Sequence, residues 1–260
     1  CYNPSMPIIQ TKSFELAIYK NGDEKSAKLA LVLPGKLDTK NYAHMRSHVD
    51  YLANRGYLAL SFDPPGTWDS QGGIELYTMT NYVRAVHELI EYFGTQSSSQ
   101  AKRKEIFVMG HSRGGSIAML AGISNPRVTH FASIMSYYSF NPKAHPEYPD
   151  EDWKKNGVKQ SKRDLPTDKN QTRVFNLPYN FLEDQIQYDM LDGLKNSKKP
   201  KLFVFGKKDS LVRPEVVKIA YEAAAQPKKL QEIDSDHDYR FHPELIEEMN
   251  EIIGDFLDTI

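Results

Sequence analysis

Cysteine is nearly absent from this chain: Cys1 is the one cysteine among 260 residues. A lone cysteine cannot form an internal disulfide, so the fold does not depend on an oxidising compartment. We therefore expect a cytoplasmic protein. Because the chain opens on cysteine rather than methionine, we consider two origins, a trimmed chain and a mature lipoprotein with lipid on Cys1. The second keeps a lipid-anchored or secreted form open.

Neither sign of charge is in excess, since 33 Lys and Arg residues face 34 Asp and Glu residues. Nucleic-acid recognition relies on clustered basic residues that neutralise phosphates, so we expect no nucleic-acid partner.

Long apolar runs are missing as well. Because a membrane span needs about 20 consecutive apolar residues, we expect no span.

Hydrophobic residues make up 40% of the chain, enough for a sizeable core in one domain over residues 1–260. Short apolar runs alternate with segments of helical periodicity. We expect strands at 29–33, 57–62, 106–109, 128–135, 201–205 and 229–233, and helices at 41–54, 76–93, from 116, 181–195, from 214 and from 243. This rhythm predicts an α/β fold with a doubly wound, mostly parallel sheet.

Two segments depart from the rhythm. Residues 14–19 alternate apolar and polar side chains and run into Asn21-Gly22, which predicts an edge strand entering a hairpin turn. Residues 137–180 are rich in proline, mixed charge and aromatic residues. A loop this long inside a compact domain is usually functional, and aromatic residues argue against a floppy excursion, so we expect an inserted lid.

The pattern Gly-x-Ser-x-Gly occurs at residues 110–114, between a predicted strand and a predicted helix. A nucleophilic serine on a strand-to-helix turn needs this context, because the turn is so tight that glycine is required on both flanks. Glycine-rich turns without a catalytic role also exist, and the flanking context favours the catalytic interpretation. Ser112 is therefore the candidate nucleophile.

A serine hydroxyl needs a base, and the base needs a group that fixes its tautomer. Asp209 and His237 follow the two last predicted strands and complete the order Ser, Asp, His. As an alternative, Asp209 is a turn or cap residue. We expect His111 to point away from the nucleophile, and packing or surface roles suffice for the other histidines. The aspartates around His237 indicate a solvated acidic loop, so we expect no metal and no cofactor.

An oxyanion also needs backbone donors. We expect one N–H from Arg113, directly after the nucleophile, and a second from Lys36 or Leu37, after Pro34-Gly35. Aromatic residues in the lid and the long loop after residue 62 suggest an apolar or aromatic acyl group. Trp68, Tyr137 and Trp153 are the candidate substrate contacts.

At this point the chain resembles the α/β-hydrolase superfamily, in its serine-hydrolase branch of esterase, monoacylglycerol-lipase-like and feruloyl-esterase-like enzymes. The resemblance rests on LALVLPG, LANRGYLALSFDPPGTWDSQGG, VMGHSRGGS, LFVFGKKDSLV and SDHDY. The chain departs from it at Pro34-Gly35, where many members have His-Gly, and at Gly66-Thr67-Trp68, where many have Gly-His-Gly.

The resemblance implies hydrolysis of a small-molecule carboxylic ester through an acyl-enzyme, without a cofactor. Two alternatives remain open at this stage. The same triad serves peptidases and acyltransferases, and a non-catalytic ligand-binding member of the fold is possible because fold does not dictate function.

Overall fold

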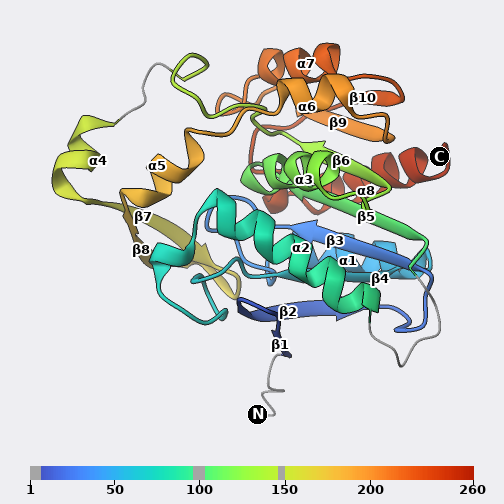
Figure 1. Cartoon of the computed structure of the whole chain (residues 1–260), viewed down its shortest axis with the longest axis horizontal. Helices are drawn as coiled ribbons and strands as arrows, with labels where there is room; N and C mark the ends of the chain where they lie inside the picture. The colour runs from blue at the N-terminus through green and yellow to red at the C-terminus, as the bar shows by residue number, and fades with distance from the viewer. Residues whose placement is uncertain (1–6, 96–102, 146–149) are drawn as a thin grey trace.

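The computed structural model describes residues 7–95, 103–145 and 150–260, and Cys1 lies outside these ranges. Its centre is an eight-stranded sheet with the order β1-β2-β4-β3-β5-β6-β9-β10 (Figure 1). The strands are β1 (Ile8–Gln10), β2 (Glu15–Asn21), β3 (Lys28–Leu33), β4 (Leu58–Phe62), β5 (Glu105–His111), β6 (His130–Ile134), β9 (Lys201–Gly206) and β10 (Lys228–Ile233). From β4 to β10 all neighbours are parallel, whereas β1 and β2 are antiparallel additions.

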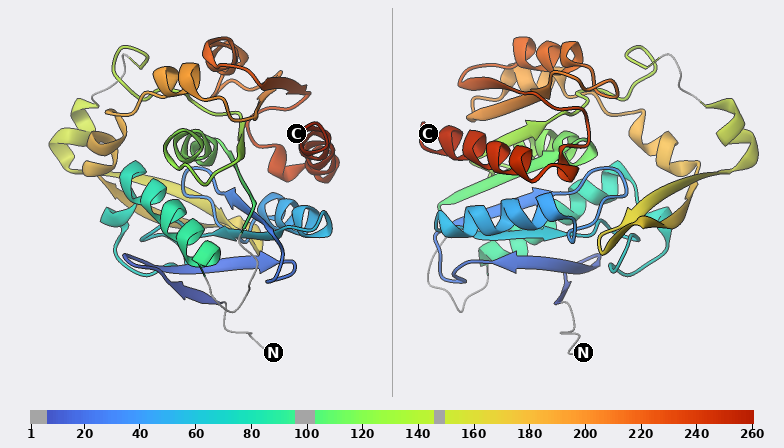
Figure 2. Two further views of the ribbon diagram at one scale, coloured as in Figure 1. Left: turned by 45° about the vertical axis from the view of Figure 1, so that its right-hand side comes forward. Right: turned by 180° about the vertical axis from the view of Figure 1, so that it is seen from behind.

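Helices cover both faces of the sheet, as the rhythm predicts. One face carries α1 (Ala43–Asn54) and α8 (Pro243–Leu257), and the other carries α2 (Met79–Thr95), α3 (Arg113–Ser124), α6 (Leu191–Asn196) and α7 (Pro214–Ala223) (Figures 1 and 2). The strand β3, whose residues 29–33 are all apolar, gives the reason for helices on both faces. Leu29, Leu31 and Leu33 enter one core and Ala30 and Val32 the other, because successive strand side chains point to opposite faces. The doubly wound fold is confirmed.

The prediction for residues 14–19 is half right. They form β2, but β2 is not at the edge and forms no hairpin with β3. It pairs with β1 on one side and β4 on the other, both antiparallel. The strand β3 is apolar on both faces and lies between the parallel strands β4 and β5, which leaves no side of β3 open for β2.

The helix expected at 181–195 is two short helices, α5 (Asn180–Gln185) and α6. Between these two helices the chain is extended and forms backbone hydrogen bonds with the segment that follows β6. Phe140 N–H donates to the Tyr188 carbonyl and Met190 N–H to the Tyr138 carbonyl. These long-range hydrogen bonds replace the local helical ones, so the apolar periodicity misled the prediction.

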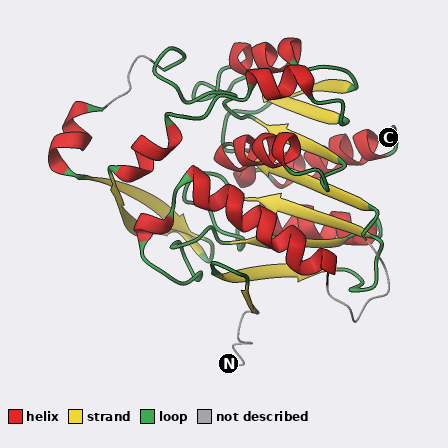
Figure 3. Ribbon diagram, viewed as in Figure 1, coloured by secondary structure: helices red, strands yellow, loops and turns green. Residues whose placement is uncertain are grey.

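Residues 137–180 depart from the alternating rhythm. They contain α4 (Glu151–Asn156) and an antiparallel hairpin of β7 (Val158–Leu165) and β8 (Asp168–Pro178), which pack beyond the carboxyl ends of the sheet strands (Figures 2 and 3). Asp150 caps α4 by accepting from the Trp153 N–H, and Gly157 ends it in the left-handed conformation. None of the helices within the described ranges is long and apolar enough to cross a bilayer.

Candidate active site

Ser112 lies on the turn between β5 and α3, with backbone angles φ 54° and ψ −124°. This strained backbone conformation requires neighbouring residues without side chains, because side chains there would clash with the backbone of the turn. A Cβ on Gly110 would lie 2.3 Å from the carbonyl carbon of Gly114, and a Cβ on Gly114 would lie 2.1 Å from the Leu33 carbonyl oxygen. The two glycines therefore allow the backbone to turn against the end of β3 and present the serine at the edge of the sheet.

The side chains of three strand ends meet in one hydrogen-bonded chain. Ser112 Oγ lies 2.9 Å from His237 Nε2, and His237 Nδ1 lies 2.7 Å from Asp209 Oδ2. The Asp209 carboxylate is buried, and its other oxygen accepts from the N–H groups of Leu211 and Val212. It is thus held as an acceptor for the histidine, while Ser112 and His237 remain partly exposed at the surface.

The turn after β3 lies against the serine. A Cβ on Gly35 would be 3.4 Å from the Ser112 Cβ, because β3 and β5 are in register up to Leu33 and Gly110. Leu37 has φ 57° and donates its N–H to Tyr77 Oη at 2.9 Å. The Lys36 N–H makes no hydrogen bond to any residue in the described ranges. Of the two predicted donors on this turn, Lys36 therefore has the available hydrogen.

Comparisons with known proteins agree with this fold. Residues 27–155 match the family model described as serine aminopeptidase, S33. The chain has the α/β-hydrolase fold. A search of the curated proteins finds no significant match.

Solved structures similar to this α/β-hydrolase share its fold along nearly the whole chain. Est1E from Butyrivibrio proteoclasticus, with ferulic acid bound, is 19% identical with a TM-score of 0.73, over 97% of this chain and 99% of that one. The Pyrococcus furiosus esterase Pf2001 is 19% identical with a TM-score of 0.69, over 97% and 91%. The α/β hydrolase GrgF from Penicillium sp. sh18 is 16% identical with a TM-score of 0.78, over 97% of each chain.

The hairpin β7–β8 is fastened to two parts of the site of this α/β-hydrolase. Arg163 donates to the Lys36 carbonyl oxygen and lies 3.4 Å from Asp38 Oδ1. Its neighbour Asp164 accepts two hydrogen bonds of 2.8 Å from Arg240, three residues after His237. The end of the hairpin therefore bridges the turn after β3 and the loop that carries the histidine.

The three aromatic residues predicted as substrate contacts occupy different positions. Trp68 donates its indole N–H to the Leu37 carbonyl at 2.8 Å and is half-buried beside the turn after β3. Tyr137, just after β6, donates to the Leu211 carbonyl at 2.5 Å. Trp153 is buried in α4, and its indole N–H donates to the Leu177 carbonyl. Trp68 is thus beside the oxyanion turn, and Trp153 lies inside the insertion.

His111 lies beside His237, a contact that the sequence did not indicate. Its ring is buried, and its centroid lies 4.8 Å from that of His237 and 5.2 Å from that of Tyr239. Side chains alternate along β5, so His111 points to the face of α1 and α8, where the loop with His237 passes over it. Burial holds the pKa of His111 well below the usual value, so the ring is neutral.

Two further buried polar side chains, Asp38 and His44, lie next to His111. Ligand atoms of Asp38, His44 and His111 all lie within 4.8 Å of one another, a set that a cation could occupy and that sequence spacing did not indicate. The Arg163 guanidinium already supplies a positive charge 3.4 Å from the Asp38 carboxylate. Burial lowers the pKa of His44 and raises that of Asp38, which favours the uncharged forms of both groups.

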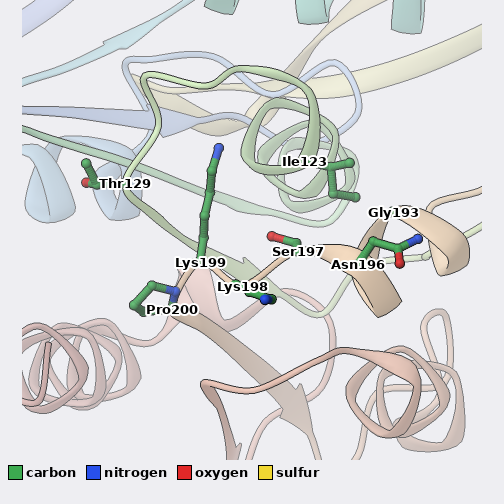
Figure 4. A pocket seen from close by; sticks show the side chains of 8 residues that line it. All are labelled: Ile123, Thr129, Gly193, Asn196, Ser197, Lys198, Lys199 and Pro200. Atoms are coloured by element: carbon green, nitrogen blue, oxygen red, sulfur yellow. The ribbon is translucent and has the colours of Figure 1, made fainter.

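One pocket of this α/β-hydrolase lies away from the serine. It has a volume of about 640 Å³ and is lined by Ile123, Thr129, Gly193, Asn196, Ser197, Lys198, Lys199 and Pro200 (Figure 4). Thr129 and Pro200 precede β6 and β9, so the pocket lies at the amino edge of the sheet, opposite Ser112. The Lys199 ammonium is already bonded to the carbonyls of Gly122 and Asn125. None of its lining residues is a histidine, a cysteine or a carboxylate.

Proposed function

We propose that this chain is a serine hydrolase that cleaves small-molecule carboxylic esters through an acyl-enzyme, with Ser112 as nucleophile. The supporting observation is the unbroken hydrogen-bonded chain from Ser112 through His237 to the buried carboxylate of Asp209. Ser112 Oγ attacks the ester carbonyl while His237 Nε2 takes its proton. The proton then passes to the leaving alcohol, and water releases the acid in the second half of the cycle.

Asp209 orients His237 and stabilises the imidazolium, because its carboxylate is held by two backbone N–H groups. The negative charge that forms on the substrate oxygen is bound by the backbone N–H groups of Arg113 and Lys36. Each such donor contributes about 3 kcal/mol to transition-state stabilisation. Arg163 binds the carbonyl oxygen of Lys36 and so fixes the Lys36–Leu37 peptide, which directly follows the donating Lys36 N–H.

Residues 137–180 act as a lid over the serine and shape the acyl pocket. Trp68 and Tyr137 contact the acyl group, and Trp153 supports the pocket from behind through Phe181, with ring centroids 5.8 Å apart. The aromatic lining favours apolar or aromatic acyl groups. The ferulic acid bound to Est1E, a protein with the same fold, is an acyl group of this kind.

The first test is covalent labelling by a fluorophosphonate, located by peptide mass spectrometry. We expect label on Ser112 in the natural protein and none in Ser112→Ala. Esterase activity on p-nitrophenyl esters and methyl ferulate should fall to the blank in Ser112→Ala and by about a thousandfold or more in His237→Ala. Full activity of Ser112→Ala, or label on another residue, contradicts the proposal.

A peptidase is the second candidate, because the matching family model is described as a serine aminopeptidase. The same triad cleaves amides when the leaving group is held suitably. Aminoacyl p-nitroanilides separate the two functions in the same assay. Hydrolysis of these amides at rates comparable to the esters, lost in Ser112→Ala, would replace the esterase by the peptidase; competing alcohols in the ester assay detect acyl transfer.

A further inference from the structure

Three buried side chains with metal-binding atoms lie together next to the nucleophile turn. Asp38 belongs to the turn after β3, His44 lies in the first turn of α1, and His111 ends β5, directly before Ser112. Ligand atoms of the three side chains lie within 4.8 Å of one another, and each residue is at most 3% exposed. The three residues come from separate segments of the chain, so the cluster forms only in the folded protein.

The polar atoms of this cluster are not used by hydrogen bonds. Within the described residues, neither ring nitrogen of His44 or of His111 has a hydrogen-bond partner, and Asp38 Oδ1 has none either. His48, one turn further along α1 and equally buried, provides the contrast, because both of its ring nitrogens are hydrogen-bonded, one to a side-chain amide and one to a tyrosine hydroxyl. Since a buried polar atom without a partner costs free energy, five such atoms in one place indicate a ligand site.

Arg163 contacts the cluster but leaves these atoms available. Its Nε lies 3.4 Å from Asp38 Oδ1, an ion pair without a hydrogen bond. The Nε hydrogen is donated to the Lys36 carbonyl oxygen instead, at 2.8 Å. Arg240 is held by Asp164 through two hydrogen bonds of 2.8 Å. A lone pair of the Asp38 carboxylate therefore remains for a second positive partner beside Arg163.

We propose that Asp38, His44 and His111 bind a divalent transition-metal ion such as Zn²⁺. One carboxylate and two imidazoles select Zn²⁺ over Mg²⁺ and Ca²⁺, which prefer oxygen ligands alone. In a tetrahedral zinc site the ligand atoms lie about 3.4 Å apart, so side-chain rotations that bring the most distant pair closer by up to about 1.4 Å provide three of the four ligands. The ion ties the turn after β3 and the start of α1 to the end of β5.

The test measures zinc binding and not activity. Protein freed of metal with EDTA is incubated with ZnCl2, and the zinc that stays with the protein through gel filtration is counted by inductively coupled plasma mass spectrometry. We expect one zinc per chain with a Kd below about 1 μM. Tm should rise by about 5 °C or more when free zinc exceeds Kd a hundredfold, because the ion binds the folded state. MgCl2 and CaCl2 at the same concentrations should do neither.

Variants of the ligands assign the site. His44→Leu and His111→Leu should each lose the zinc and the rise in Tm, whereas His44→Cys should keep both, because a thiolate is also a zinc ligand. In EDTA, His44→Leu should melt no lower than the natural protein, since the change removes two buried nitrogens without partners, so its loss of zinc is not a loss of folding. The matched control is His130→Leu. His130 is buried at the start of β6, its Nε2 has no hydrogen bond within the described residues, and its variant should keep the zinc.

Two results overturn the metal site. If no zinc stays with the natural protein and ZnCl2 leaves its Tm unchanged, the three side chains face only each other or water. If zinc binds equally well to His44→Leu and His111→Leu, the ion lies elsewhere on the chain. Covalent labelling of Ser112 is a separate measurement, so the proposed ester hydrolysis stands or falls independently of the metal.

Discussion

Arg163 donates two hydrogen bonds, from Nε and Nη2, to the carbonyl oxygen of Lys36, at 2.8 and 2.6 Å. The insertion thereby fixes the plane of the peptide next to the proposed oxyanion donor. Arg163→Met should lower kcat on a short neutral ester by about tenfold with little change in KM, because a misaligned donor acts mainly on the transition state.

The control for Arg163 comes from the same hairpin. Arg173 lies on β8 with its guanidinium over Trp68 and makes no contact with the Lys36 carbonyl. Arg173→Met should keep kcat within about twofold, since it touches no peptide of the oxyanion turn. Equal losses in the two variants would show that the hairpin matters only through general packing.

His111 should act as a positioning residue for His237. Its ring lies 4.8 Å from that of His237, so His111→Ala should lower kcat by about tenfold and shift the acid limb of the pH–rate profile. His130 is a matched control: it is buried and stacks on Phe107 at the same 4.8 Å centroid distance, at the far edge of the sheet. His130→Ala should lose stability while its pH–rate profile stays unchanged.

Lys40 should be a strong determinant of stability. Its fully buried ammonium lies 2.7 Å from carboxylate oxygens of both Asp63 and Asp69, which ties the loop after β4 to the turn after β3. Lys40→Met leaves a buried carboxylate without its cation and should reduce the free energy of unfolding by about 3 to 5 kcal/mol. Urea unfolding measures it, with Lys195→Met as the control. That variant removes an exposed pair with Asp192 and should change stability by less than about 1 kcal/mol.

Acid should destabilise the fold before the carboxylates are protonated. Burial lowers the pKa of His48 to about 4, while the unfolded chain has the usual value of 6.5. The unfolded state then binds more protons between these values, so stability is fully present above pH 6.5 and falls as the pH drops towards 4. For His48 alone the loss is on the order of 3 kcal/mol.

Urea unfolding at several pH values, compared between His48→Gln and the natural protein, measures this slope. We expect a shallower decline in the variant. His242→Gln is the control, because His242 is exposed at the start of α8 and should leave the slope unchanged. A stability that stays flat down to pH 4 would contradict the prediction.

Local signals in the sequence were sufficient for the parallel strands of the sheet and for bringing Ser112, Asp209 and His237 together. The run of residues 29–33 is apolar on both faces, which suits a parallel strand covered by helices on both sides. The glycines on either side of Ser112 are needed because a side chain there would clash with the backbone of the turn. Each of these signals lies within a few residues. The positions of Asp209 and His237 follow because parallel strands end at the same edge.

The features that the sequence did not predict depend on contacts between residues that are far apart in the chain. Residues 188–190 are not helical, because their backbone groups form hydrogen bonds with the segment after β6. The strand β2 pairs with β4 and not with β3, the next strand in the sequence. The contact of His111 with His237 depends on how the histidine loop crosses the sheet.

The strands β6 and β9 are hydrogen-bonded neighbours, so the chain between them leaves and re-enters the sheet at adjacent positions. In topological terms the whole of residues 137–180 is one long loop, and replacing it alters no strand pairing of the main sheet. Ser112, Asp209 and His237 all lie outside it. Recombination confined to this one continuous stretch of the gene would exchange the proposed lid while the descendants keep Ser112, Asp209 and His237.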